Sequence, residues 1–253
     1  EPVLFELGAD GRFVDVGIAR HVAVRYAADQ NNVTWTTRAL DLDRDGYLDL
    51  MSASGELSSA NFIGNGPDLQ NLWLRGKPDG TFIAEAPFDA FDVPGNSSRD
   101  FALVDVDGDD RPEIVAVHMH GGISVFRDSE PTPAPTQLTL VPTMTAPGAA
   151  GAVVELTCDG VRRTRHVVGG GDYGNADVGE VSFSFPAPCD GPGHALSGLV
   201  RWPSGYVQAV SATTGRRLRI LEDAWLVVGD DALTVDLSGH LEPADEVAAI
   251  AHD

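Results

Sequence analysis

The amino-acid sequence predicts an all-β protein. Its apolar runs are short and rich in β-branched and aromatic residues, as at 114–117 (IVAV), 153–156 (VVEL) and 181–185 (VSFSF). Clusters of Gly, Asp, Pro and Asn separate these runs, which is typical of strands joined by turns. A helical period over a dozen residues is hard to find, and the best candidate is the short stretch 244–251.

Two pairs of segments in the first half repeat one another. Residues 40–50 read LDLDRDGYLDL and residues 104–114 read VDVDGDDRPEI, 64 positions further on. Residues 4–13 (LFELGADGRF) and 72–82 (LWLRGKPDGTF) each place an Asp-Gly turn between strand-like runs, which suits a hairpin. A repeat of this length that combines a hairpin with an Asp-rich loop indicates β-propeller blades. We therefore expect a partial β-propeller of two to three blades in residues 1–130.

A proline-rich segment marks the expected domain boundary. Residues 128–136 read DSEPTPAPT, which has little to bury and predicts an extended linker, placed at 131–137. Residues 138–222 are again β-rich and predict a small β-sandwich-like domain. Residues 223–253 form a tail, in which alternation at 224–228 and 233–237 is compatible with one more hairpin.

Length and charge limit the classes of partner. A chain of 253 residues is long enough for two domains. Its 17 Lys and Arg against 38 Asp and Glu give a formal charge of −21, which argues against nucleic acid or an anionic membrane as the partner. The sequence as given has no apolar run long enough to span a membrane and no leader pattern, so we expect neither. Many of the acids cluster at regular spacing, which indicates cation sites.

The first Asp-rich segment has the pattern of a calcium loop. The predicted ligands at positions 1, 3, 5 and 9 are Asp41, Asp43, Asp45 and Asp49, and the carbonyl oxygen of Tyr47 is the ligand at position 7. Ca²⁺ takes several oxygen ligands, and alternate residues of a tightly turned loop can all point inward. Gly46 permits the sharp turn. The loop lacks the Glu at position 12 and the flanking helices of an EF-hand, so we expect it to join two strands.

The second segment repeats this pattern with two changes. Its predicted ligands are Asp105, Asp107, Asp109, the carbonyl oxygen of Arg111 and, at position 9, the longer side chain of Glu113. Asp110 stands where the first loop has glycine, and Asp tolerates a left-handed backbone better than most residues. Carboxylates packed this closely repel one another without a cation, so we expect metal binding to be coupled to local folding. The alternative is a pair of Asp-rich surface turns.

The two cysteines predict one disulfide. Cys158 and Cys189 are each followed by Asp-Gly in a turn-like setting, and neither has the spacing of a zinc site. The alternative is a pair of free buried thiols. A disulfide would place the protein in an oxidising compartment.

These motifs resemble a known repeat. The pairing of the hairpin at 4–13 with the loop pattern DxDxDGxxDL at 41–50 is similar to the FG-GAP or VCBS repeat of integrin α-subunit propellers and many bacterial secreted proteins. Residues 163–173 (RTRHVVGGGDY) and 199–208 (LVRWPSGYVQ) resemble the ASPIC/UnbV domain, which follows such repeats in the cartilage acidic protein family. The resemblance implies integrin-α-like blades in a Ca²⁺-binding protein that is secreted, periplasmic or on the cell surface.

The number of blades predicts association. A closed propeller commonly has about six to eight blades, and at this repeat length two or three fit before the linker. An open stack of blades leaves sheet edges uncovered. We therefore expect another protein chain, or the remainder of the propeller, to complete it.

Two histidines are candidates for a further metal site. His118 and His120 are two residues apart, and alternate residues of a strand share a face, a spacing used for Zn²⁺ or Cu²⁺. A third ligand is not evident from the sequence, although His21, His166 and His194 are candidates in space. The alternative is ordinary exposed or hydrogen-bonded strand histidines.

Two functions follow from these observations. The first is an extracytoplasmic β-propeller-type protein or subunit that binds two structural Ca²⁺ ions and recognises a protein or a glycan. A glycan could stack on Trp202 if that side chain is exposed, although the alternative is a core tryptophan. The second is a metalloenzyme, a hydrolase or an oxidoreductase, with a second metal near His118 and His120 and with a site completed by another chain. Its catalytic residues are unknown, and the sequence has no GxSxG nucleophile elbow.

Overall fold

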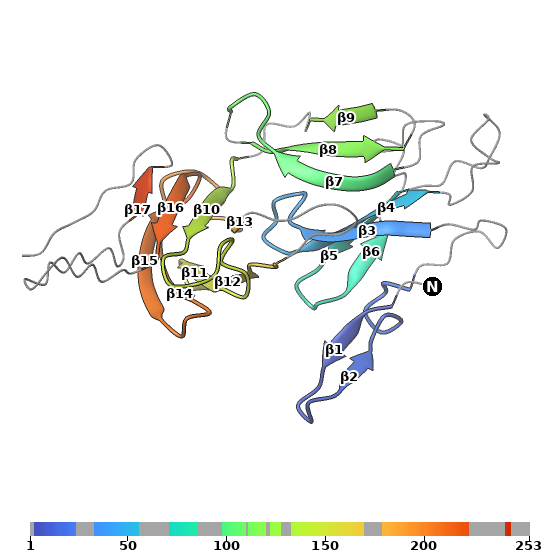
Figure 1. Cartoon of the computed structure of the whole chain (residues 1–253), viewed down its shortest axis with the longest axis horizontal. Coiled ribbons are helices and arrows are strands. Elements are labelled where there is room, and N and C mark those ends of the chain that lie inside the picture. Colours follow the sequence, from blue (N-terminus) through green and yellow to red (C-terminus); the bar gives the residue numbers. More distant parts are fainter. Residues whose placement is uncertain are drawn as a thin grey trace, which may run out of the picture. The chain divides into compact units, whose positions relative to one another are not determined.

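The computed structural model describes residues 3–23, 33–55, 71–84, 98–109, 111–119, 122–127, 133–169, 179–222 and 241–243. Every secondary-structure element in these ranges is a β-strand, which confirms the predicted all-β fold (Figure 1). The chain divides into two compact units, one made of residues 1–42, 47–106 and 112–129 and the other of residues 43–46, 107–111 and 130–253. We call strands β1–β9 the blade region and strands β10–β17 the sandwich.

The described part of the blade region contains three antiparallel sheets. The first is a hairpin of β1 (Phe5–Leu7) and β2 (Phe13–Asp15). The second has the order β3 (Val33–Leu40), β4 (Asp49–Gly55), β5 (Leu72–Gly76) and β6 (Phe82–Ala84). The third has the order β7 (Ser98–Val104), β8 (Glu113–His118) and β9 (Gly122–Phe126). Strands that pair in chain order are the layout of propeller blades, so the fold is that of a partial propeller.

The two larger sheets of the blade region share one apolar core. Met51 and Ala53 of β4 pack with Phe101, Ile114 and Ala116 of β7 and β8, and all five are buried. These residues alternate along their strands, because every second side chain of a strand points to the same face. An ion pair between the largely buried side chains of Arg38 and Asp100, at 3.3 Å, joins the same two sheets.

The hairpins β1–β2 and β5–β6 are built alike, as their sequences predict. They have the same pairing register. In each turn an Asp carboxylate accepts a hydrogen bond from the backbone amide two residues on, at 3.1 Å for Asp10 and 2.9 Å for Asp79. The Asp side chain forms an Asx turn, and the glycine after it, Gly11 or Gly80, has a positive φ. These two requirements explain why Asp-Gly occurs in both turns. The hydrogen bonds from Thr81 also lower the pKa of Asp79.

The sandwich consists of two four-stranded sheets. One has the order β13 (Glu180–Phe183), β10 (Thr136–Val141), β16 (Arg217–Leu221) and β17 (Leu241–Pro243), in which β10 and β16 are parallel. The other has the order β12 (Val161–His166), β11 (Val153–Cys158), β14 (Ala195–Arg201) and β15 (Val207–Thr213) and is antiparallel. Buried residues of both sheets form one core, in which Leu138, Leu156, Val200 and Ile220 are fully buried or nearly so. The predicted sandwich-like fold is therefore confirmed.

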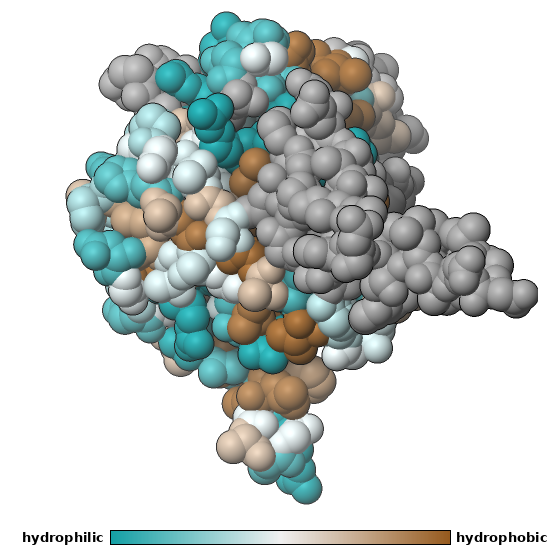
Figure 2. Space-filling view, turned by 90° about the vertical axis from the view of Figure 1, so that its left-hand side faces the viewer, coloured by the Kyte–Doolittle hydropathy of each residue, from teal (hydrophilic) through white to brown (hydrophobic). Residues whose placement is uncertain are grey.

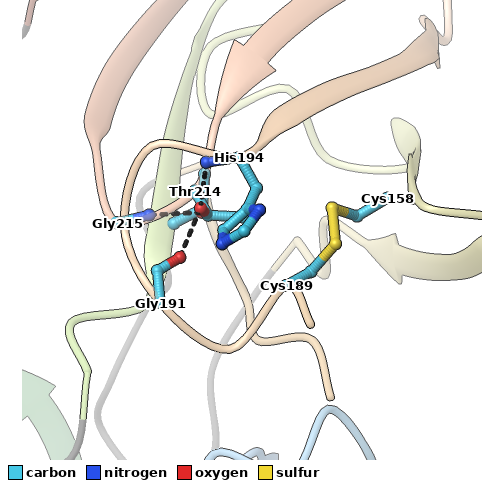
Figure 3. Close-up of a disulfide and its surroundings, with 7 residues drawn as sticks. Cys158, Cys189, Gly191, His194, Thr214 and Gly215 are labelled. Carbon is cyan, nitrogen blue, oxygen red and sulfur yellow. Dashed lines mark hydrogen bonds between the residues drawn. A yellow bond between two sulfur atoms is a disulfide. The ribbon is translucent and has the colours of Figure 1, made fainter. Parts of the chain in front are cut away.

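The predicted disulfide between Cys158 and Cys189 is present in the core of the sandwich (Figure 3). It joins the end of β11 to the loop before β14. Beside it, the Thr214 hydroxyl accepts a hydrogen bond from the amide of His194 at 2.9 Å and donates one to the carbonyl of Gly191. The covalent bond and these hydrogen bonds fix the same loop at two places.

The Trp-Pro-Ser-Gly segment closes a buried carboxylate network in the sandwich. Glu222 is fully buried, and its oxygens accept hydrogen bonds from the Ser204 hydroxyl at 2.6 Å, from the Thr145 hydroxyl and from three backbone amides at residues 143–145. Burial alone would raise the pKa of Glu222, but these hydrogen bonds outweigh it and lower the pKa from 4.5 to about 2. Trp202 is buried, and its indole N–H donates to Gln208, so it is a core residue.

The regions around the sandwich are partly described. β10 begins at Thr136, inside the segment predicted as the 131–137 linker, and residues 133–135 carry no strand. In the tail, β17 pairs with β16, whereas the hairpin expected at 224–237 and the helical candidate at 244–251 lie outside the described residues. No helix that could cross a membrane occurs in the described part of the chain.

Candidate metal centres

Each Asp-rich loop connects the first two strands of its sheet. The pair that closes the first loop is Leu40 with Asp49, and the equivalent pair in the second is Val104 with Glu113. Both hairpins also have a register shift at the same place, between residues 34 and 36 and between residues 98 and 100. The two loops therefore start and end at equivalent points of equivalent frameworks, as the sequence repeat predicts.

The first loop brings three carboxylates together. Oxygens of Asp41, Asp43 and Asp45 lie within 4.8 Å of one another, and all three side chains are half-buried. The amide of Asp45 donates to Oδ1 of Asp43 at 3.3 Å. Gly46 has a φ of 88°, in agreement with the sharp turn expected at that position.

The second loop has the same triad in a more open setting. Oxygens of Asp105, Asp107 and Asp109 also lie within 4.8 Å of one another, but only Asp105 is half-buried and the other two side chains are exposed. The amide of Arg111 donates to Oδ1 of Asp109 at 2.9 Å. Asp110, predicted to stand in for the glycine of the first loop, lies outside the described residues.

The acids at position 9 have a structural role that the sequence alone did not indicate. Asp49 is fully buried, and its oxygens accept hydrogen bonds from the amides of Leu42 at 3.1 Å and Gly76 at 2.8 Å. Glu113 is also buried and accepts the equivalent bond from the amide of Val106 at 2.9 Å. Each of these side chains thus holds position 2 of its own loop against the second strand. The side chains of Asp49 and Glu113 and the carbonyls of Tyr47 and Arg111 all stay predicted ligands.

Position 4 is left-handed in both loops, which sequence reasoning missed. Arg44 has a φ of 61° and Gly108, the equivalent residue, a φ of 78°. A side chain in this conformation costs about 1 kcal/mol, whereas glycine adopts it freely. The signal was in the sequence, because the second loop carries its glycine at position 4 rather than at position 6.

The chemistry of the triads favours a hard divalent cation. Each triad offers carboxylate oxygens only, and three such groups within 4.8 Å repel one another strongly unless a positive charge lies between them. Oxygen ligands are preferred by Ca²⁺ and Mg²⁺, whereas Zn²⁺ and Cu²⁺ prefer sites that include nitrogen or sulfur. These residues therefore fit the predicted calcium ions.

His118 lies in a buried polar network within the blade region. Its Nδ1 lies 3.3 Å from the Ser98 hydroxyl and its Nε2 lies 2.8 Å from the Ser124 hydroxyl. The Asn71 side chain donates to Ser98 at 3.1 Å and accepts from the amide of Ser54, which extends the network to β4. Burial lowers the pKa of His118, so the ring is neutral at pH 7.

This network occupies the nitrogens that a transition metal would need. Both ring nitrogens of His118 face serine hydroxyls, so a metal would have to displace at least one of these contacts. Among the described residues, no group of three metal-binding side chains includes His118. His120 lies outside the described residues, so the predicted pair is not tested.

Comparison with known protein families identifies a repeat in the blade region. A family model described as an FG-GAP-like repeat matches residues 41–116, a segment that begins at the first Asp of the first loop and ends in β8. It therefore contains both Asp triads. FG-GAP-like repeats are typical of β-propeller-type recognition proteins and often bind calcium. No curated protein matches the chain.

Proposed function

We propose that this chain is an extracytoplasmic calcium-binding protein, or a subunit of one, whose propeller-type blades recognise a protein or a glycan. The observation that carries the proposal is the recurrence of an Asp triad at the same place in two hairpins of identical register, within the segment matched as an FG-GAP-like repeat. Two unrelated surface turns would have no reason to share this framework.

Calcium acts structurally in this proposal. Each loop is fixed at its ends by a buried acid at position 9, and the triad between those ends carries three like charges. Binding of a divalent cation removes the repulsion and couples folding of the loop to the metal. The ion therefore stabilises the hairpins, and the recognition surface lies elsewhere on the blades.

Two observations support an extracytoplasmic location. The disulfide between Cys158 and Cys189 is of a kind that forms and persists in oxidising compartments. The FG-GAP-like repeat fits an extracellular protein. We place the protein in the secreted, periplasmic or cell-surface class.

We assign the sandwich to an ASPIC/UnbV-like domain, as in the cartilage acidic protein family. The assignment rests on the resemblance of residues 163–173 and 199–208, and the family match at 41–116 does not reach it. The contacts of the second segment give it a physical meaning, because Trp202 fills the core and Ser204 closes the Glu222 network. A glycan partner would have to use a residue other than Trp202, since that side chain is buried.

No observation in the described residues favours the alternative of a metalloenzyme at His118 and His120. That alternative stays a prediction, and metal analysis of the purified protein tests it. Zinc or copper at one equivalent per chain, lost on replacing His120 by Ala, would support it.

Calorimetric titration of the metal-free protein with Ca²⁺ tests the proposed function. We expect two binding events, of which Asp43→Asn removes one and Asp107→Asn removes the other, because each substitution takes one charge from one triad. The matched control is Asp190→Asn, an exposed Asp outside both loops, which should keep both events. Absence of calcium binding to the unaltered protein, or its persistence in the double loop variant, would contradict the proposal.

A further inference from the structure

The sheet β7–β9 has an apolar face that nothing covers in the described part of the chain. Val115 pairs with Val125 and Val117 with Ile123, so these four side chains share one face, which we call the outer face. The exposed fractions of Val117, Ile123 and Val125 are 44%, 67% and 53%. Adjacent exposed apolar residues in a sheet indicate an interaction surface, whereas isolated ones do not.

The equivalent face of the sheet β3–β6 is an interface. Because the registers of β3–β4 and β7–β8 match, Met51 and Ala53 occupy the positions of Val115 and Val117. Met51 and Ala53 are fully buried, and they are covered by Phe101, Ile114 and other residues of the neighbouring sheet. The same position of the repeat is thus covered by aromatic and aliphatic side chains in the sheet β3–β6, whereas no described residue covers it in the sheet β7–β9.

The hairpin β1–β2 has a second apolar face that no described residue covers. Phe5, Leu7 and Phe13 share one face of the hairpin β1–β2, with exposed fractions of 57%, 59% and 70%. In Figure 2 this hairpin is the projection at the bottom of the view, and hydrophobic atoms gather on it. A two-stranded hairpin is marginally stable by itself, so this face also needs a partner.

The hairpin β1–β2 is suited to pack by its face rather than by its edge. In the equivalent hairpin, Gly76 lies against the carbonyl of Leu48, where a Cβ atom would collide with the loop. Leu7 occupies the position of Gly76. If β1–β2 joined a pair of the β3–β4 kind as β5–β6 does, Leu7 would meet the equivalent loop carbonyl, which favours a contact through the face of the hairpin.

We propose that these two faces bind one another between two copies of this chain. Within one copy, the segment after β2 is tied to β5–β6, because Arg20 donates to the carbonyl of Asp79 and accepts from the amide of Phe82. The inner face of β7–β9 packs on that same sheet and the outer face points away from it, so the contact is intermolecular. Phe5, Leu7 and Phe13 of one copy cover Val117, Ile123 and Val125 of the next, as Phe101 and Ile114 cover Met51 and Ala53 within the chain. The contact joins different surfaces of the two copies, so it continues into a ring or an open chain.

Charge sets the conditions under which this association forms. Each copy carries a formal charge of −21, and like charges repel. Asp15 pairs with Phe5 and therefore adds one carboxylate to the face of the hairpin. Salt screens the repulsion and leaves the apolar contact intact. Association should therefore strengthen as the ionic strength rises. The proposed association is independent of whether the Asp loops bind calcium. All samples nevertheless contain saturating Ca²⁺, so that the loops of every variant are in the same state.

Light scattering coupled to size-exclusion chromatography tests the proposal. We expect the unaltered protein to show at least about twice the mass of a single chain at high concentration. Ile123→Lys and Phe13→Lys should each reduce it to the mass of one chain, because each buries a charge in the contact. The matched control is Val207→Lys on β15, where Val207 is 50% exposed, and it should associate like the unaltered protein.

Mixing the two variants distinguishes the proposed contact from a symmetric one. Phe13→Lys keeps an intact outer face and Ile123→Lys keeps an intact hairpin, so an equimolar mixture should form dimers that grow no further. A monomeric unaltered protein at all concentrations and salt levels would overturn the proposal, as would normal association of either variant alone. Unchanged far-ultraviolet circular dichroism of each variant shows that it is folded.

Discussion

The blade region and the sandwich both bury carboxylates, but they stabilise them differently. In the sandwich, Glu222 accepts five hydrogen bonds from Ser204 and residues 143–145, so the protein itself satisfies the charge. In the blade region, Asp49 accepts two backbone hydrogen bonds, while the triad beside it places three further carboxylates within 4.8 Å of one another. The sandwich satisfies its acid with its own hydrogen bonds, whereas each Asp triad groups carboxylates that could hold a metal ion.

The acids within one loop also differ from one another in burial and hydrogen bonding. Asp49 and Glu113 are as buried as core residues and hold the loop to its strands. The triad residues are half-buried or exposed and face each other. Two separate contributions to the free energy of unfolding are therefore expected in the blade region. One is the set of hydrogen bonds to the acid at position 9, and the other is a cation bound at positions 1, 3 and 5.

The largest expected effect is the loss of the acid at position 9. Asp49→Ala should lower the free energy of unfolding by about 4 kcal/mol in the presence of chelator, because two buried amides lose their acceptor. Glu113→Ala should cost less, about 2 kcal/mol, because one backbone amide is affected and its other partner, Arg127, is largely exposed. Urea unfolding measures both, with Glu180→Ala, an exposed acid in β13, as the control. Equal costs for the three variants would refute the structural role of position 9.

The second effect concerns pH and the sandwich. The pKa of Glu222 is about 2 in the folded chain against 4.5 when unfolded, so its ionised form stabilises the sandwich above pH 4.5. That contribution, of order 3 kcal/mol, is lost as the pH falls from about 4.5 to about 2. The difference in unfolding free energy between the unaltered protein and Glu222→Gln should therefore shrink over this window. A difference that stays constant down to pH 2 would show that Glu222 is not held as the anion.

The smallest expected effect on stability concerns position 4 of the two Asp loops. Arg44→Gly should stabilise the metal-free protein, and Gly108→Ala should destabilise it, each by about 1 kcal/mol, because position 4 is left-handed in both loops. Thermal unfolding of both variants in chelator checks the signs. Opposite signs would mean that the loops take another conformation without metal.

Much of the architecture follows from local sequence. The repeated segments at 40–50 and 104–114 correctly indicated equivalent loops that join two strands, because the period-two alternation of β4 and β8 and the turn residues between the strands are local signals. The Asp-Gly turns at residues 10 and 79 are equally local. The pairing of two cysteines in a chain that has only two left few alternatives.

The features that escaped sequence reasoning depend on distant contacts. Three of the donors to Glu222 are amides of a turn 77–79 residues earlier in the chain, and nothing near Glu222 indicates them. The role of Asp49 depends on Gly76, 27 residues further on. The burial of His118 between Ser98 and Ser124 likewise depends on how three strands meet. Such roles are decided by tertiary packing, so they cannot be predicted from residue type and spacing alone.

Hydrogen exchange with and without calcium tests the central claim most directly, because it reports on each region separately. We predict that chelation of Ca²⁺ accelerates amide exchange in β3, β4, β7 and β8 and in the loops between them, and leaves the strands around Glu222 and the disulfide unchanged. Asp43→Asn with Asp107→Asn should reproduce the effect of chelation and abolish the response to calcium. Exchange that does not change with calcium in β3, β4, β7 and β8, or that changes equally in the sandwich, would contradict the account.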